Sequence, residues 1–162
     1  MRHSTEAYYI KWRHCAWHWD KGVRYLRIWV NGKTGARWLI AKHKAVDVLR
    51  RLHARQQDIA DIPFDELFER QLDLRVFRAS DGTTFGRMDS TWHNLIRASG
   101  LLKDATGQNR SMYSLRHTYA TLALMRGEVD IHTLAKQLGN SVAMIERYYS
   151  KLTPTMVAAR LA

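Results

Sequence analysis

The sequence predicts a mainly α-helical chain with a small antiparallel β-sheet near its N-terminus, an α+β fold class. Residues 8–41 alternate in side-chain character and contain a glycine-bracketed turn, which is typical of a β-hairpin. From His43 onward, apolar residues recur every three or four positions, which is typical of amphipathic helices. The chain has 162 residues, of which 46% are hydrophobic, enough to form one packed domain.

The strands are predicted from "VRYLRIWV" (residues 23–30) and "ARWLIA" (residues 36–41), with "NGKTG" as the turn between them. Lys33 then occupies the turn. The preceding segment "YYIKWRHCAWHW" is aromatic-rich and alternates in part, so it is also predicted to be extended. The tryptophans of this region are expected to serve core and sheet packing; they are Trp12, Trp17, Trp19, Trp29 and Trp38.

Helices are predicted in order along the rest of the chain. The first begins at His43, and a short one follows Pro63 over Phe64 to Leu72. Residues 77–87, "FRASDGTTFGR", form a predicted loop because of their Asp-Gly pair and glycines. Asp89 or Ser90 is then expected to cap a helix that ends at Gly100.

Three further helices are predicted from their capping residues. Ser114 is expected to cap a helix that stops at Gly127, and Asp130 the next one, which ends at Gly139. Ser141 is expected to cap a final helix that carries two adjacent tyrosines, Tyr148 and Tyr149.

The charge of the chain indicates a polyanionic partner. Lysine and arginine total 26 against 15 acidic residues, a formal net charge of +11. Nucleic acid is the first candidate partner, and an anionic membrane surface the second. The membrane reading lacks a basic amphipathic helix with an exposed apolar face, and no apolar run approaches the roughly 18 residues of a membrane span. The single cysteine, Cys15, fits a reducing compartment.

Four motifs, in this order and spacing, resemble the catalytic segment of the tyrosine recombinase (phage integrase) family. "RHSTEAYYIKW" resembles the first arginine box and "VNGKTGARWLI" the β-hairpin; "YSLRHTYAT" resembles the second box and "LGNS" the third. The family's site residues correspond to Arg2, Lys33, Tyr113, Arg116 and Asn140, and the nucleophile to Tyr149, nine residues after Asn140. Tyr113 replaces the family's usual histidine, and Asn140 its histidine or tryptophan.

The resemblance implies a tyrosine recombinase catalytic domain over residues 1–162, without a preceding DNA-clamping domain, and with a C-terminal tail at 153–162. It implies site-specific DNA recombination, in phage or prophage integration and excision, through a covalent 3′-phosphotyrosine. The implied partners are a double-stranded DNA attachment site and further copies of the protein, a tetramer for the full-length protein. The implied location is the bacterial cytoplasm, and the implied origin a phage or mobile element.

The required chemistry independently suits these residue types. Two arginines, Arg2 and Arg116, can clamp the non-bridging phosphate oxygens because their guanidinium forks match phosphate and stay charged. Lys33 can protonate the leaving 5′-oxygen, and Tyr149 can attack phosphorus. Tyr113 and Asn140 would hydrogen-bond the phosphate or orient the others. No cofactor or metal is expected, because the arginines supply the electrostatic stabilisation.

Helix geometry and spacing distinguish the two tyrosines. Adjacent helical residues point about 100° apart, so one of the pair faces a given site. The nine-residue spacing selects Tyr149, and Tyr148 is expected to pack.

Three alternatives remain open from the sequence. A degenerate recombinase relative would bind DNA without cutting it, and a type IB topoisomerase would share the chemistry. A helix-turn-helix module over residues 132–149 would bind DNA without catalysis. Its second helix begins with Val142, Ala143, Met144 and Ile145, which predicts burial rather than base contact.

Overall fold

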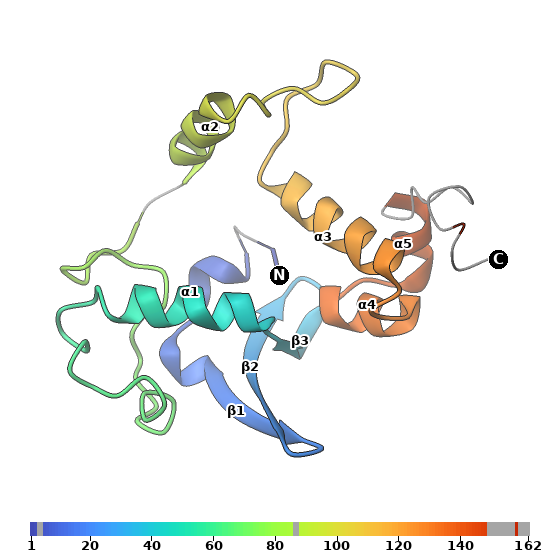
Figure 1. Ribbon diagram of the computed structural model, residues 1–162. Helices are drawn as coiled ribbons and strands as arrows, with labels where there is room; N and C mark the ends of the chain where they lie inside the picture. The colour runs from blue at the N-terminus through green and yellow to red at the C-terminus, as the bar shows by residue number, and fades with distance from the viewer. Residues whose placement is uncertain (3–4, 86–87, 149–157, 159–162) are drawn as a thin grey trace. The chain divides into compact units, whose positions relative to one another are not determined.

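The computed structural model describes residues 1–2, 5–85, 88–148 and 158. The chain divides into two compact units, Met1–Arg87 and Met88–Ala162, which are described in turn. Within the described residues, the first unit carries a three-stranded sheet and one α-helix, and the second carries four α-helices (Figure 1). The α+β composition with a small antiparallel sheet near the N-terminus is therefore confirmed.

The sheet is antiparallel, with strands in the order β1 (Cys15–Asp20), β2 (Val23–Gly32) and β3 (Gly35–Ile40). The β1–β2 turn places Lys21 at φ 50° and Gly22 at φ 77°, the left-handed pair that a tight two-residue hairpin requires. In the second hairpin Gly32 pairs with Gly35, so Lys33 and Thr34 form the turn. The predicted position of Lys33 is confirmed.

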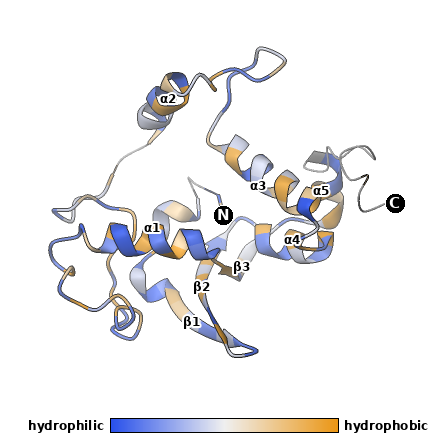
Figure 2. Cartoon of the chain, viewed as in Figure 1, coloured by the Kyte–Doolittle hydropathy of each residue, from blue (hydrophilic) through white to orange (hydrophobic). Residues whose placement is uncertain are grey.

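One face of the sheet builds the core of the first unit. Leu26, Ile28 and Val30 alternate along β2 and are buried, as the sequence pattern predicts. Helix α1 (His43–His53) adds Val46 and Leu49 to the same cluster, and Figure 2 shows its mixture of hydrophilic and hydrophobic residues. The other buried members of the cluster lie before, within and after the sheet in sequence: Ile10, Trp12, Cys15, Leu39, Ile59, Phe64, Leu67, Phe68 and Val76.

The tryptophan prediction is correct only in part. Trp12, in the short 3₁₀ turn η2 (Trp12–His14), is fully buried, and Trp17 packs against the core. Trp29 and Trp38 face each other across β2 and β3 with ring centroids 5.1 Å apart, yet they are 37% and 42% exposed. They lie on the face opposite Leu26 and Ile28, so the sheet's alternation keeps them out of the core. Trp19, near the end of β1, is 65% exposed.

The predicted helix over Phe64 to Leu72 is wrong, because the segment is a series of turns. Its backbone bonds switch between i→i−3, from Glu69 to Glu66, and i→i−4, from Leu67 to Pro63. Gln71 takes φ 50°, outside the helical region. Phe64, Leu67 and Phe68 all enter the core, so tertiary packing overrides the helical pattern here.

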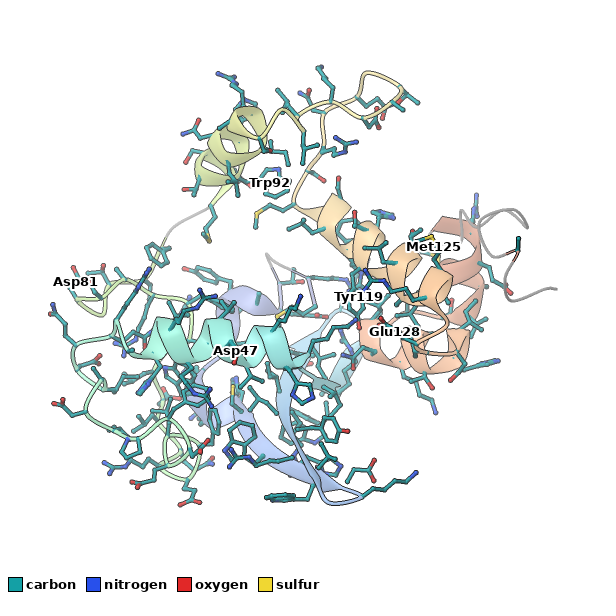
Figure 3. All side chains as sticks on the ribbon, in the orientation of Figure 1. Asp47, Asp81, Trp92, Tyr119, Met125 and Glu128 are labelled. Atoms are coloured by element: carbon teal, nitrogen blue, oxygen red, sulfur yellow. The ribbon has the colours of Figure 1, made fainter. Side chains whose placement is uncertain are left out.

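The second unit consists of α2 (Asp89–Ala98), α3 (Tyr113–Arg126), α4 (Ile131–Leu138) and α5 (Val142–Tyr148) in its described residues. Helices α3, α4 and α5 share a core, whose buried members are Ala120, Ala123, Leu124, Leu134, Ala135, Leu138 and Ile145. Trp92 lies on α2 (Figure 3). Its Nε1–H donates to the carbonyl of Arg110 at 3.3 Å and so connects the loop after α2 to the helix. No helix in the described part of the chain is long and apolar enough to span a membrane.

The capping predictions for α4 and α5 are confirmed. Asp130 Oδ1 accepts hydrogen bonds from the backbone N–H of His132 and Thr133, at 2.9 and 3.0 Å. Ser141 Oγ accepts from the N–H of Met144 at 3.3 Å. The left-handed stops at Gly127 and Gly139 are confirmed as well, with φ 65° and 64°.

The capping predictions for α2 and α3 are wrong by one or two residues. Helix α2 begins at Asp89 and follows Met88, which makes no side-chain cap bond. Helix α3 begins at Tyr113 and follows Met112, which has helical backbone angles and makes no side-chain cap bond. Ser114 therefore lies within the first turn of the helix. Ser114 Oγ instead accepts from the N–H of Ser111 at 3.2 Å, outside the helix.

We expect Gly139→Ala to destabilise the second unit by about 1–2 kcal/mol, because a Cβ is disfavoured at its left-handed φ of 64°. Asparagine tolerates this conformation, so Gly139→Asn is expected to lose clearly less. Chemical denaturation followed by far-ultraviolet circular dichroism measures both. Equal losses for the two variants would show that side-chain bulk, rather than backbone conformation, governs the position.

Candidate active site

Arg2 is held in place by a buried carboxylate. The Glu6 side chain is fully buried, and its Oε1 accepts from Arg2 NH1 at 3.0 Å. The backbone N–H of Arg2 donates to Glu6 Oε2 at 2.9 Å, and the Arg2 carbonyl accepts from the N–H groups of Glu6 and Ala7. The Arg2 side chain is 18% exposed, so it is an anchored group rather than a frayed terminal charge.

The same carboxylate is bound to the β-hairpin. Arg37 on β3 donates from NH1 to Oε1 at 3.1 Å and from NH2 to Oε2 at 3.0 Å, a bidentate pair. Gly32 lies against the carboxylate so closely that a Cβ there would come within 2.5 Å of Oε1. Glu6 therefore joins the N-terminal segment to the turn end of the hairpin.

The pKa of Glu6 lies below its ordinary value of 4.5. Burial tends to raise this pKa, but the hydrogen bonds from Arg37, the backbone bond from Arg2, and the charges of Arg37 and the N-terminus outweigh burial. Glu6 is therefore ionised at neutral pH.

Lys33 is exposed in the turn of the β2–β3 hairpin. Arg2 NH1 lies 3.5 Å from the Oγ1 of Thr34, the residue that follows Lys33. The first unit thus brings Arg2 to the turn that carries Lys33. A guanidinium and an exposed ammonium near one turn form a positively charged site suited to a phosphate.

A buried polar network supports the N-terminal segment at Trp12. Gln56 is fully buried, and its Oε1 accepts from Trp12 Nε1 at 3.0 Å and from Arg78 Nε at 3.1 Å. Arg78 is only 4% exposed and binds both oxygens of Asp58, at 2.8 and 2.7 Å. The network fixes Trp12, and with it the segment that leads from Glu6 into the sheet.

We expect Glu6→Ala to destabilise the protein by about 3 kcal/mol, because it leaves two partly buried arginines without their shared carboxylate. Asp65→Ala is the matched control, since it breaks an ion pair with Arg24 whose side chains are 37% and 53% exposed. An exposed pair of this kind contributes less than about 1 kcal/mol. Urea denaturation at pH 7 gives both values, and a Glu6→Ala loss no larger than the control would contradict the buried-pair interpretation.

The stabilisation by Glu6 is also expected to depend on pH. The folded pKa lies below the ordinary 4.5, so the contribution is complete above pH 4.5 and declines as the pH falls through the folded pKa. The difference in unfolding free energy between wild type and Glu6→Ala should therefore shrink at acidic pH. A constant difference from pH 7 down to strongly acidic pH would show that the carboxylate charge is not the source of the stabilisation.

In the second unit, Arg116 is buried on the first turn of α3. Its side chain is 6% exposed, and NH2 donates a short hydrogen bond of 2.5 Å to the carbonyl of Leu138. Leu138 is the last residue of α4, where the backbone carbonyls carry partial negative charge. This contact explains how an arginine is accommodated near the start of α3, and it fixes the guanidinium at the α4–α5 turn.

Tyr113 and Asn140 both lie at this arginine. The Tyr113 ring centroid is 5.9 Å from the Arg116 guanidinium carbon and 5.1 Å from the His117 ring. Asn140 follows Leu138 by two residues, and its N–H donates to the Ala135 carbonyl at 2.9 Å, which fixes the turn. Three of the predicted site residues, Tyr113, Arg116 and Asn140, are therefore brought together within the second unit.

The predicted nucleophile lies outside the described residues. Tyr148 is the last residue of α5, and Tyr149 follows it. The predicted tail, 153–162, also lies outside them except for Ala158, which is helical.

The structure adds residues that the motifs did not reveal. Arg37, Gln56, Asp58 and Arg78 make buried or partly buried polar contacts in the first unit. One signal was present for Arg37, since strand alternation places it on the same face as buried Leu39, where a charge needs a partner. Gln56, Asp58 and Arg78 lie in irregular segments, where no periodicity predicts burial.

No group of three or more His, Cys, Asp or Glu side chains that could hold a metal occurs among the described residues. Comparisons of the chain with protein-family models, with curated proteins and with solved structures find no match.

Proposed function

We propose that this chain is a tyrosine recombinase catalytic domain that cleaves and rejoins double-stranded DNA through a 3′-phosphotyrosine. The proposed substrate is the attachment site of a phage or other mobile element in the bacterial cytoplasm, and several copies of the protein act together on DNA. The observation that carries the proposal is the buried Arg116 at the turn of Asn140, in a sequence that also supplies an anchored Arg2 beside the Lys33 hairpin.

Arg2 and Arg116 are both oriented before any substrate binds, which supports the proposed function. Arg2 is fixed by Glu6 and Arg116 by the Leu138 carbonyl, so both guanidinium groups have defined positions. Electrostatic stabilisation of a transition state is most effective when the donors are preorganised in this way. A merely basic surface would present long, exposed arginines instead.

The second support is the excess of positive charge. The chain has a net charge of +11, and α1 alone exposes basic side chains at Lys44, Arg50 and Arg51. Such a surface favours a DNA backbone through counterion release, independent of sequence.

The proposed reaction uses the chain's own side chains. The Tyr149 hydroxyl attacks phosphorus and releases its proton to water, the bond from phosphorus to the 5′-oxygen breaks, and Lys33 protonates the departing oxygen. Arg2 and Arg116 bind the non-bridging oxygens, where charge grows in the transition state. Attack by a 5′-hydroxyl on the phosphotyrosine reverses these steps and rejoins the strand.

A non-catalytic DNA-binding module is the second candidate, and the geometry of α4 and α5 favours it more than the sequence did. The expected burial of the start of α5 is wrong in part: Ile145 is fully buried, but Met144 is 44% exposed and Ala143 is exposed as well. With Val142 half-buried, α5 packs on one face and presents the other to solvent, as a recognition helix does. The exposed face carries Glu146 and Arg147.

The deciding experiment traps the covalent intermediate. The protein is incubated with a nicked suicide DNA substrate, the products are separated on a denaturing gel, and the DNA-linked peptide is identified by mass spectrometry. The proposal predicts a shifted band whose DNA is attached through tyrosine. Retarded DNA in a native gel without any covalent band would instead support the non-catalytic module.

A further inference from the structure

We propose that Arg37 is a positioning residue for DNA cleavage: by binding Glu6 bidentately, it fixes the guanidinium of Arg2 at the turn end of the β2–β3 hairpin. The inference rests on the proposed recombinase function and adds a residue that the recombinase motifs do not assign. Arg37 acts through Glu6 and Arg2, not on the DNA itself.

Arg37 lies on the face of the sheet that carries buried side chains. Arg37 pairs with Val30 across β2 and β3, and it shares a sheet face with Leu39, which is 4% exposed. Its side chain is 14% exposed. A guanidinium directed toward a core needs an anionic partner, and Glu6, whose side chain is fully buried, is that partner.

Hydrogen bonds from Arg2 and Arg37 fill the acceptor sites of the Glu6 carboxylate. Glu6 accepts four hydrogen bonds, two from the Arg37 fork, one from Arg2 NH1 and one from the Arg2 backbone N–H. A carboxylate has about four lone-pair sites, so Arg37 occupies half of them. Arg37 thereby restricts the Arg2 guanidinium to a single bond with Glu6.

The cluster of Arg2, Arg37 and Glu6 is positively charged, because two guanidinium groups share one carboxylate at the hairpin. If Arg37 were absent, Arg2 could turn its fork onto Glu6 and form a neutral bidentate pair. Arg2 would then face the carboxylate instead of a DNA phosphate.

The hairpin backbone at Gly32 limits where the Glu6 carboxylate can lie. A Cβ at Gly32 would lie 2.5 Å from Glu6 Oε1, so the carboxylate packs directly against the hairpin backbone. Glu6 therefore has a fixed location, and the two arginines compete for its oxygens there.

The test compares Arg37→Met with Arg24→Met, a control that removes the same charge from the neighbouring strand β2. Arg24 binds Asp65 at 3.3 Å in an exposed ion pair, away from Glu6. In the DNA-free protein, the ¹⁵N resonance of Arg2 Nε is expected to shift in Arg37→Met and to stay in place in Arg24→Met. Arg37→Lys, which retains the charge and the packing of the stem, is expected to shift the resonance as well, because a lysine cannot form the fork.

The second measurement is the single-turnover rate of covalent adduct formation at saturating DNA. We expect Arg37→Met to lower this rate by about tenfold or more, because small misplacements of a catalytic group are costly. Affinity for an uncleavable duplex should change by less than about twofold, since Arg37 does not contact DNA. With a neutral methylphosphonate at the scissile position, the loss should largely disappear, because that substrate lacks the non-bridging charge that Arg2 neutralises.

The outcomes distinguish a failure of this inference from a failure of the proposed function. If wild type cleaves and Arg37→Met cleaves equally fast, the inference is overturned and the function stands. An equal loss on phosphate and methylphosphonate substrates also overturns it, since Arg37 would then be a scaffold residue. If wild type forms no adduct but the Arg2 resonance shifts as expected, the function fails while the control of Arg2 by Arg37 holds. An unshifted resonance overturns that control whatever the cleavage result.

Discussion

Tyr149→Phe is expected to abolish the covalent DNA adduct completely, while Tyr148→Phe forms it at a rate within about twofold of wild type. Phenylalanine keeps the ring but lacks the hydroxyl that attacks phosphorus, so no phosphotyrosine can form. The two substitutions make the same chemical change at adjacent positions, which makes each the control for the other. The measurement is the fraction of nicked suicide substrate that becomes protein-linked on a denaturing gel.

Binding must be measured alongside cleavage. Both variants should retard the intact duplex as wild type does, because neither substitution changes the charge of the protein. Loss of the adduct in Tyr148→Phe together with its retention in Tyr149→Phe would exchange the two roles. Retention in both variants would exclude this pair as the source of the nucleophile.

Arg116→Lys is expected to slow adduct formation by about 10²–10³-fold, even though the charge is retained. A lysine cannot offer the planar fork that binds two phosphate oxygens, and removing one preorganised donor has an effect of about this size. Arg116 also donates to the Leu138 carbonyl, so stability should fall by about 1–3 kcal/mol as that buried carbonyl loses its donor. Single-turnover kinetics and urea denaturation measure the two effects separately.

The matched control is Arg126→Lys, at the exposed C-terminal end of the same helix. Its contact with Glu128 is 3.5 Å long and solvent-exposed, so neither stability nor cleavage should change appreciably. Unchanged cleavage by Arg116→Lys, measured where the variant is fully folded, would remove Arg116 from the proposed phosphate clamp. Its contact with Leu138 would then be purely structural.

Much of the fold was predictable because it depends on local rules. The hairpin around Lys33 follows from strand alternation and flanking glycines, and α4 from the Asp130 cap and Gly139. One failure lies where packing overrides local preference. Residues 64–72 bury three apolar side chains by turns instead of a helix. The predicted cap of α3 fails for a local reason, because the helix already begins at Tyr113, before Ser114.

The candidate site was also predictable only in part from the sequence. The motifs picked out Arg2 and Arg116 by spacing, and the structure places both where a second group fixes them. The partners could not be read from the sequence, because Arg37 and Glu6 are 31 residues apart and Arg116 and Leu138 are 22 apart. Contacts over such separations depend on how the elements pack, and no periodicity encodes them.

The sequence alone determined the positive charge and the hairpin that presents Lys33, and it predicts Tyr149 rather than Tyr148 as the nucleophile. Each of these follows from composition, from strand or helix periods, or from spacing along the chain. The tertiary structure decided that Glu6 is the carboxylate two arginines share and that Arg116 is held by the end of α4. It could do so because burial makes an unpaired charge costly, so each buried ion must find a partner in space, however far away that partner lies in sequence.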